Sequence, residues 1–196
     1  MATNNKVHFG LKNVHYALIT YSTEGVPSWG TPKAVPGAVS LTLSKEGSDT
    51  DFYADDIKYF HLAGNNGYSG SLEMASFPPS MRNDIWGNTI TSTSKMLVED
   101  IDAQPAEFAL LFEIDGDKNA ERYCFYRCQA SRPDVASSTK AETTEVQTQS
   151  CDLTAMPVMD PTAESVINGK VYYKTTADTP SATYADFYGA VNVTLT

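Results

Sequence analysis

FALLFEIDGDKNAERYCFYRCQASRP, residues 108 to 133, is the stretch that decides the fold. Two runs rich in aromatic and aliphatic residues flank the polar sequence at positions 115 to 119, and this arrangement predicts a β-hairpin. Because side chains alternate along a strand, the first run would place on one face Phe108, Leu110, Phe112 and Ile114, and on the other Ala109 and Leu111. The returning run would place Tyr123 and Phe125 on one face, and Cys124, Tyr126 and Cys128 on the other.

Both faces of this predicted hairpin are too apolar for a sheet that meets water on one side. We therefore expect one face to be covered by the domain's own core and the other by a second layer that the rest of the chain must supply or recruit. Six of these side chains are predicted as core or interface residues: Phe108, Leu110, Phe112, Tyr123, Phe125 and Tyr126.

Length, charge and cysteine content narrow the class of protein. The 196 residues fit one domain, no apolar run approaches the roughly 20 residues of a membrane helix, and the N-terminus lacks the apolar core of a secretory signal. We expect a protein made in the cytoplasm, with no membrane contact. The formal net charge of −10, without a cluster of Lys and Arg, argues against sustained binding to nucleic acid.

The three cysteines are predicted to be reduced and buried. Cys124 and Cys128 lie on one predicted strand, where their Cα atoms would be roughly 13 Å apart, whereas a disulfide needs about 7 Å or less. Only Cys151 could pair with either, and one thiol would then be left over.

Alternation and turn residues organise the rest of the chain. Further strands are predicted over residues 6–23 (interrupted near Gly10 or Asn13), 39–43, 68–77, 95–100, 146–156, 170–175 and 191–195, with loops at 24–36 and 89–93. Short helices are predicted over residues 78–87, where Met81, Ile85 and Trp86 form the buried stripe, and over 179–189, with Thr179 as N-cap. The sum is a mainly β protein of eight to ten strands, an antiparallel β-sandwich or partial barrel with one or two short flanking α-helices.

A long acidic connection separates two of these strands, at about residues 44–66. Connections of that length are usually functional or disordered, and its aromatic residues argue against disorder. We predict a loop that docks onto a partner through Asp51, Phe52, Tyr53, Asp55, Asp56, Ile57, Tyr59 and Phe60. Replacing Tyr53 and Tyr59 with alanine should then impair assembly more than folding.

Each candidate motif for catalysis or metal binding in the sequence lacks residues that the motif requires. The sequence from Asp115 begins like a calcium loop but has Ala120 where glycine is needed and Tyr126 where glutamate is needed. The serine in GYSGS, residues 67–71, lacks the final glycine and the strand–turn–helix context of a nucleophile elbow. The three histidines show no metal-ligand spacing, and solvated or interface charge is favoured over cation binding for the acidic residues 49–56. We expect no enzyme, no cofactor and no metal.

Several segments together resemble the major tail protein family of long-tailed, non-contractile bacteriophages. They are KVHFGLKNVHYA (6–17), PGAVSLTLSKEG (36–47), FYADDIKYF (52–60), NNGYSGSLEMA (65–75), the hairpin 108–133 and, more weakly, EVQTQSCDLTAMP (145–157). The resemblance fades from about Pro161. It divides the chain into a tail tube β-sandwich domain, residues 1–160, and a C-terminal arm, 161–196, packed on the same domain or on a neighbouring subunit.

This resemblance implies a structural virion protein. Such subunits form rings of six that stack into a tube around a tape-measure protein, with tail terminator and distal tail proteins at the ends, and the genome crosses the tube only as a transient passenger. The long connection and the terminal arms make the contacts between rings. An acidic subunit suits this role, because a ring of six carries a formal charge of about −60 and repels DNA. The location implied is the virion tail, and the host cytoplasm before assembly.

Two other functions remain open. One is a tube subunit of a related bacterial injection system. The other is a carbohydrate-binding β-sandwich, suggested by Trp29, Trp86 and the eleven tyrosines.

Overall fold

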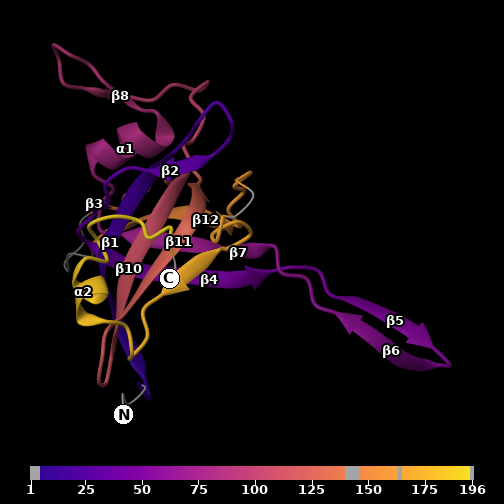
Figure 1. The fold of residues 1–196 in the computed structure, drawn as a ribbon. Helices are drawn as coiled ribbons and strands as arrows, with labels where there is room; N and C mark the ends of the chain where they lie inside the picture. Colours follow the sequence, from indigo (N-terminus) through magenta and orange to yellow (C-terminus); the bar gives the residue numbers. More distant parts are fainter. Residues whose placement is uncertain (1–4, 140–145, 163–164, 195–196) are drawn as a thin grey trace.

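One curled antiparallel sheet dominates the computed structural model, which describes residues 5–139, 146–162 and 165–194. Strand order in this sheet is β2-β1-β10-β11-β12-β7-β4, with β3 added to β1 and β13 added to β11 (Figure 1). The strands are β1 (His8–Tyr21), β2 (Pro27–Trp29), β3 (Lys33–Ala34), β4 (Ala38–Glu46), β7 (Gly67–Met74), β10 (Phe108–Gly116), β11 (Glu121–Ala130), β12 (Gln149–Met156) and β13 (Tyr172–Lys174). Two further pairs stand apart: β5 (Thr50–Ala54) with β6 (Ile57–Leu62), and β8 (Thr89–Ile90) with β9 (Leu97–Val98).

The predicted hairpin at residues 108–133 is confirmed as the pair β10–β11 at the centre of the sheet. Both of its faces are covered. The first face contributes to a large inner cluster that includes Phe108, Leu110, Phe112 and Phe125. The opposite face contributes Ala109, Leu111, Cys124 and Tyr126 to a smaller outer cluster.

Cys128 lies on the inner face, not on the outer face where simple alternation placed it. The register runs from Phe108 opposite Cys128 to Leu110 opposite Phe125, so β11 carries one extra residue at this point. Such a β-bulge reverses the side to which later side chains point. All three cysteines are free and buried, as predicted.

The sheet curls so that its two ends approach the same core. Leu11 on β1 and the pair Leu41 and Leu43 on β4 all pack against the inner cluster, although β1 and β4 lie far apart in the strand order. The arrangement is a partial barrel, mainly β and antiparallel, as the sequence predicts. Helix α1 (Pro79–Trp86) covers one end and buries Met81, Ile85 and Trp86.

The C-terminal part of the chain covers the outer face of β10–β11. Val158, Ile167, Phe187 and Val191 complete the outer cluster. Helix α2 (Ser181–Ala185) is shorter than predicted and has Pro180 rather than Thr179 as its N-cap. The predicted strand at residues 191–195 is wrong for residues 191–194, which are irregular, and Leu195 lies outside the described residues.

A buried charge cluster holds this layer to the sheet. Arg122 Nε donates to Glu113 Oε2 at 2.6 Å, and the Glu113 side chain is 4% exposed. The same guanidinium lies over the ring of Tyr184, 3.8 Å from its centroid, and donates to the Tyr184 carbonyl oxygen. A charged pair at this depth stays favourable only while both partners are present, so Arg122 ties the C-terminal layer to the hairpin.

Neither helix of the described residues has the length and apolarity needed to cross a membrane.

Candidate functional site

The acidic connection predicted as a loop is a β-hairpin, which we call the arm: strands β5 and β6 with the turn between them. It projects away from the body of the molecule (Figure 1). Asp55 and Asp56 form its two-residue turn with φ of 52° and 61°, the backbone of a type I′ turn, whose twist matches that of paired strands. The loop prediction was wrong because this turn lacks the Asn-Gly or Asp-Gly sequence that usually marks it.

One face of the arm is apolar and uncovered. Pairing places Phe52 opposite Phe60, and Leu62 lies two residues further along on the same face. A one-residue bulge at Tyr59 returns Ile57 to this face, opposite Ala54. The side chains that form the apolar face are 56–62% exposed: Phe52, Ile57, Phe60 and Leu62.

The opposite face of the arm is charged. Asp51 accepts from Lys58 Nζ at 2.7 Å and contacts His61 Nδ1 at 2.5 Å. The hydrogen bonds from Lys58 and then His61 hold the pKa of Asp51 below its usual value. Tyr53 shares this face. The arm is therefore amphipathic, and both of its strands are exposed along nearly their whole length.

The base of the arm is a close crossing of two backbones. A Cβ added at Gly47 would lie 2.1 Å from the Gly64 carbonyl oxygen, and one added at Gly64 would lie 2.5 Å from the Ser48 carbonyl oxygen. Only glycine allows chains to approach this closely. The Asp49 side chain accepts from the Gly64 amide at 3.2 Å and adds a further contact across the base.

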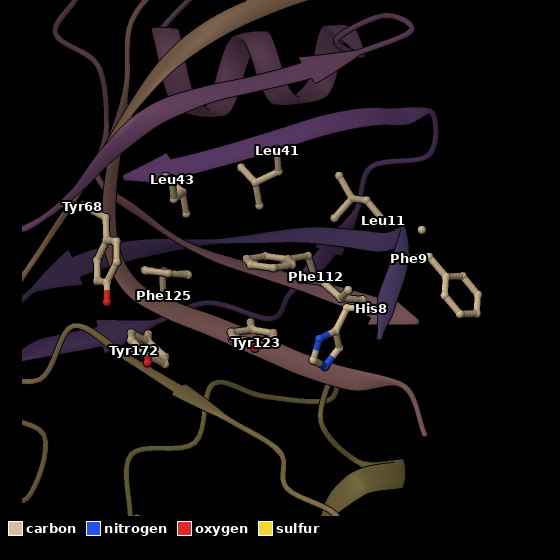
Figure 2. A pocket seen from close by; sticks show the side chains of 12 residues that line it. His8, Phe9, Leu11, Leu41, Leu43, Tyr68, Phe112, Tyr123, Phe125 and Tyr172 are labelled. Atoms are coloured by element: carbon tan, nitrogen blue, oxygen red, sulfur yellow. The ribbon is translucent and has the colours of Figure 1, made fainter. Parts of the chain in front are cut away.

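A second feature is an apolar pocket of about 440 Å³ between the facing ends of the curled sheet (Figure 2). Phe112 and Phe125 from the central hairpin are its most buried lining residues, and their rings stack with centroids 6.0 Å apart. Tyr68 meets Phe125 edge-on at 5.5 Å. The other lining residues are His8, Phe9, Gly10, Leu11, Leu41, Leu43, Ile114, Tyr123 and Tyr172.

Unpaired strand edges flank this pocket. Within the described residues, no strand pairs with the outer edge of β4, and none pairs with the outer edge of β1 before His15. Exposed edges are ready sites for pairing with another chain. The pocket is therefore a place where the barrel remains open.

The outward face of β4, β7 and β12 has an unusual composition. The pairing of these strands aligns their outward-facing residues in three rows, and each row contains one residue from each strand. Seven of the nine side chains are hydroxyls and two are carboxylates: Ser40, Thr42, Ser44, Ser69, Ser71, Glu73, Ser150, Asp152 and Thr154. Glu73 accepts hydrogen bonds from Thr148 and Ser40, which lower its pKa. This surface, the hydroxyl face, is polar and acidic and presents no cation.

The site residues predicted from the sequence lie in three different parts of the structure: the core clusters, the pocket and the arm. Phe108 and Leu110 are deep core residues, and Tyr126 lies on the opposite face with its hydroxyl donating to the Asn192 carbonyl oxygen at 2.8 Å. The other three hairpin candidates line the pocket: Phe112, Tyr123 and Phe125. All eight arm candidates lie on the arm: Asp51, Phe52, Tyr53, Asp55, Asp56, Ile57, Tyr59 and Phe60.

Sequence reasoning missed Leu62 and the pocket. Leu62 continues the apolar face of the arm. A predicted hairpin that pairs Phe52 with Phe60 would have placed Leu62 on the same face. The pocket joins segments too distant in sequence for any local pattern to reveal, notably Leu41, Leu43 and Tyr172.

Other chemistry is sparse in the described part of the chain. Burial raises the pKa of the Cys124 and Cys151 thiols to about 12, and no group of three or more His, Cys, Asp or Glu is placed to hold a metal there. Trp86 is buried, and Trp29 packs on the outer cluster with its Nε1 donating to the Tyr126 carbonyl oxygen at 2.8 Å. Neither indole ring forms an open platform for a sugar.

No family model matches the chain, and no curated protein matches its sequence. Solved structures similar to it include the sheath/tube terminator of an extracellular contractile injection system (PVC) in the extended state, 9% identical over 84% of this chain and 94% of that chain, with a TM-score of 0.44. The tube-terminating cap of the anti-feeding prophage is 11% identical over 89% and 97%, with a TM-score of 0.43. A chain of the PVC sheath–tube complex is 11% identical over 76% and 88%, with a TM-score of 0.42. The two PVC proteins belong to a contractile injection system.

Proposed function

We propose that this chain is a structural tail protein, the subunit of a tail tube. In this proposal six copies form a ring, and rings stack into a hollow tube through which a viral genome leaves the particle. In this role the protein catalyses no reaction. It acts through the surfaces it offers to further copies of itself.

The observation that carries the proposal is the uncovered arm. A two-stranded hairpin is marginally stable alone in water, and this one exposes four large apolar side chains along one face: Phe52, Ile57, Phe60 and Leu62. Single exposed hydrophobic residues need no explanation, but a contiguous apolar face marks an interaction site. An arm that is amphipathic and points away from its own body suits contact with another subunit.

The hydroxyl face supports a channel function. Carboxylates repel phosphate, and hydroxyls contact it without a charge. Lys and Arg side chains, in contrast, bind phosphate strongly because they displace its counterions. Thr42, Ser71 and Asp152 lie side by side at the centre of this face. A tube lined by six copies of it would let duplex DNA slide without being retained.

Several partners follow from this proposal. The subunit would contact further copies of itself, a tape-measure protein within the tube, and terminator and distal tail proteins at its ends. DNA would be a transient passenger. The assembled protein would reside in the virion tail, after synthesis in the host cytoplasm.

Electron microscopy tests this function. Purified protein, concentrated in steps, should form rings or hollow tubes of uniform diameter, and deletion of the gene should leave phage heads without functional tails. A protein that stays a monomeric globule at high concentration, in a phage whose tails assemble normally without the gene, would contradict the proposal.

A further inference from the structure

We propose that the apolar pocket between β1 and β4 is the socket for the arm of a second copy of this chain. The inference rests on the proposed function, because it names the surface that the arm binds in the assembly. It concerns two surfaces of one chain, the apolar face of the arm and the pocket shown in Figure 2.

The two surfaces match in polarity. The floor of the pocket is aromatic, with Phe112 and Phe125 stacked and Tyr172 tilted against Phe125 at 5.1 Å. The arm offers Phe52 and Phe60 as a cross-strand pair that is more than half exposed. Aromatic side chains gain most when they are buried against others in offset or edge-on contact, and the pocket presents rings in both orientations.

The unpaired edges beside the pocket add a second means of binding. Strand β4 offers nine residues without a partner on its outer edge in the described structure, and β1 is unpaired there before His15. The arm itself consists of two strands with free outer edges. A strand added at such an edge binds through main-chain hydrogen bonds while its alternate side chains enter a pocket.

The charges around the pocket are opposite in sign to those of the arm. Three basic residues border the pocket: His8 lines it, Lys174 Nζ lies 5.3 Å from the centroid of the Tyr123 ring, and Lys45 follows Leu43 on the same face of β4. Glu121 partly neutralises them through contacts with His8 at 3.2 Å and Lys174 at 2.9 Å.

The arm has the opposite balance. It carries three carboxylates against Lys58 and His61: Asp51, Asp55 and Asp56. Like charges would repel a wrong partner, whereas opposite charges favour and orient this one.

Geometry requires the occupant to come from another molecule. The arm extends away from the body (Figure 1), so its turn lies far from the strands that line the pocket of the same chain. A projection on one surface that fits a hollow on a different surface makes a heterologous contact. Contacts of this kind propagate into rings or filaments, which is the assembly that a tube needs.

Complementation between two defective variants tests the socket. Phe52→Ser with Phe60→Ser removes the arm contact and leaves the pocket intact, whereas Leu43→Glu places a carboxylate in the pocket and leaves the arm intact. Tyr172→Glu, at an exposed edge position, replaces Leu43→Glu if that variant fails to fold. Val135→Glu, at an exposed position outside both the arm and the pocket, is the control.

We expect each defective variant alone to form no arm-mediated complex, and an equimolar mixture to form a 1:1 complex in size-exclusion chromatography with light scattering. The pocket variants should raise the critical concentration for assembly at least about tenfold, because they bury an unpaired charge, and Val135→Glu should change it less than about threefold. A mixture that forms no complex, or a Leu43→Glu protein that assembles like wild type, would overturn the socket.

Two further outcomes distinguish the socket from the tube function and from a site for a small molecule. If wild-type protein forms tubes but the mixture does not pair, the socket is wrong and the tube function stands; if the mixture pairs but no tubes form, the tube function is wrong. If Leu43→Glu abolishes binding of the uncharged apolar dye Nile red to the monomer without changing assembly, the pocket is a site for small apolar molecules, and the socket is likewise overturned.

Discussion

Replacing Phe60 with serine should weaken assembly without affecting the folded body. The side chain is 56% exposed, and an aromatic side chain buries about 200 Å² when fully covered, so roughly 110 Å² remains for a partner to cover. At about 25 cal/mol per Å², full coverage is worth about 2.5–3 kcal/mol and half coverage about 1.4 kcal/mol. The critical concentration for assembly should therefore rise between about tenfold and 100-fold.

The assay is sedimentation of assembled protein over a series of total concentrations, since the soluble plateau gives the critical concentration. Urea unfolding of the dilute subunit is the folding control, and Phe60→Ser should change its free energy of unfolding by less than about 0.5 kcal/mol. Tyr53→Ser is the matched control. The sequence alone predicted Tyr53 as a contact, but the residue lies opposite Lys58 on the charged face of the arm, so its replacement should have the smaller effect. A critical concentration for Phe60→Ser within about threefold of wild type, or an equal rise for Tyr53→Ser, would refute the assignment of the apolar face as the contact.

Three further predictions concern the body of the subunit. Arg122→Ala should lower the free energy of unfolding by up to about 3–5 kcal/mol, because Glu113 keeps a buried charge with only Lys12, 3.2 Å from its other oxygen, as partner; a loss below about 1 kcal/mol in urea titration would contradict this account. None of the three thiols should react with Ellman's reagent before unfolding, since burial raises the pKa of Cys124 to about 12, and fast labelling of folded protein would show the burial to be wrong. Thr42→Lys combined with Ser71→Lys should leave assembly intact but make tubes retain a short DNA duplex in a gel-shift assay; tubes that still release DNA would indicate that the hydroxyl face does not line the channel.

The centre of the fold could be predicted from the sequence because its signals are local. Alternating apolar residues around the polar tip identified β10 and β11, and Pro79 with Gly87 bounded helix α1. The short strands β2, β3 and β8 escaped detection because they lie in stretches rich in turn residues, where pairing with distant partners overrides weak local preference.

The candidate site was predictable only in part. Composition indicated a docking segment in the acidic connection and identified Phe52 and Phe60, but the turn at Asp55 and Asp56 gave no sign of a hairpin. The face assignment of Cys128 failed for a related reason, since a bulge is a property of the pairing and leaves no mark in one strand's sequence. The pocket depends on the curl of a whole sheet and was beyond any local pattern.

The length of the arm also sets a distance between copies in any assembly that is joined through it. From Gly47 to Asp55 the chain makes eight rises of about 3.3 Å each, which gives a reach of about 26 Å from the glycine crossing to the turn. If copies join through the arm, that reach limits the axial repeat of the proposed tube. Adding two residues to each arm strand, which keeps the apolar face on the same side, would then lengthen the repeat by about 6.6 Å, so the spacing of the assembly would be encoded in a single hairpin.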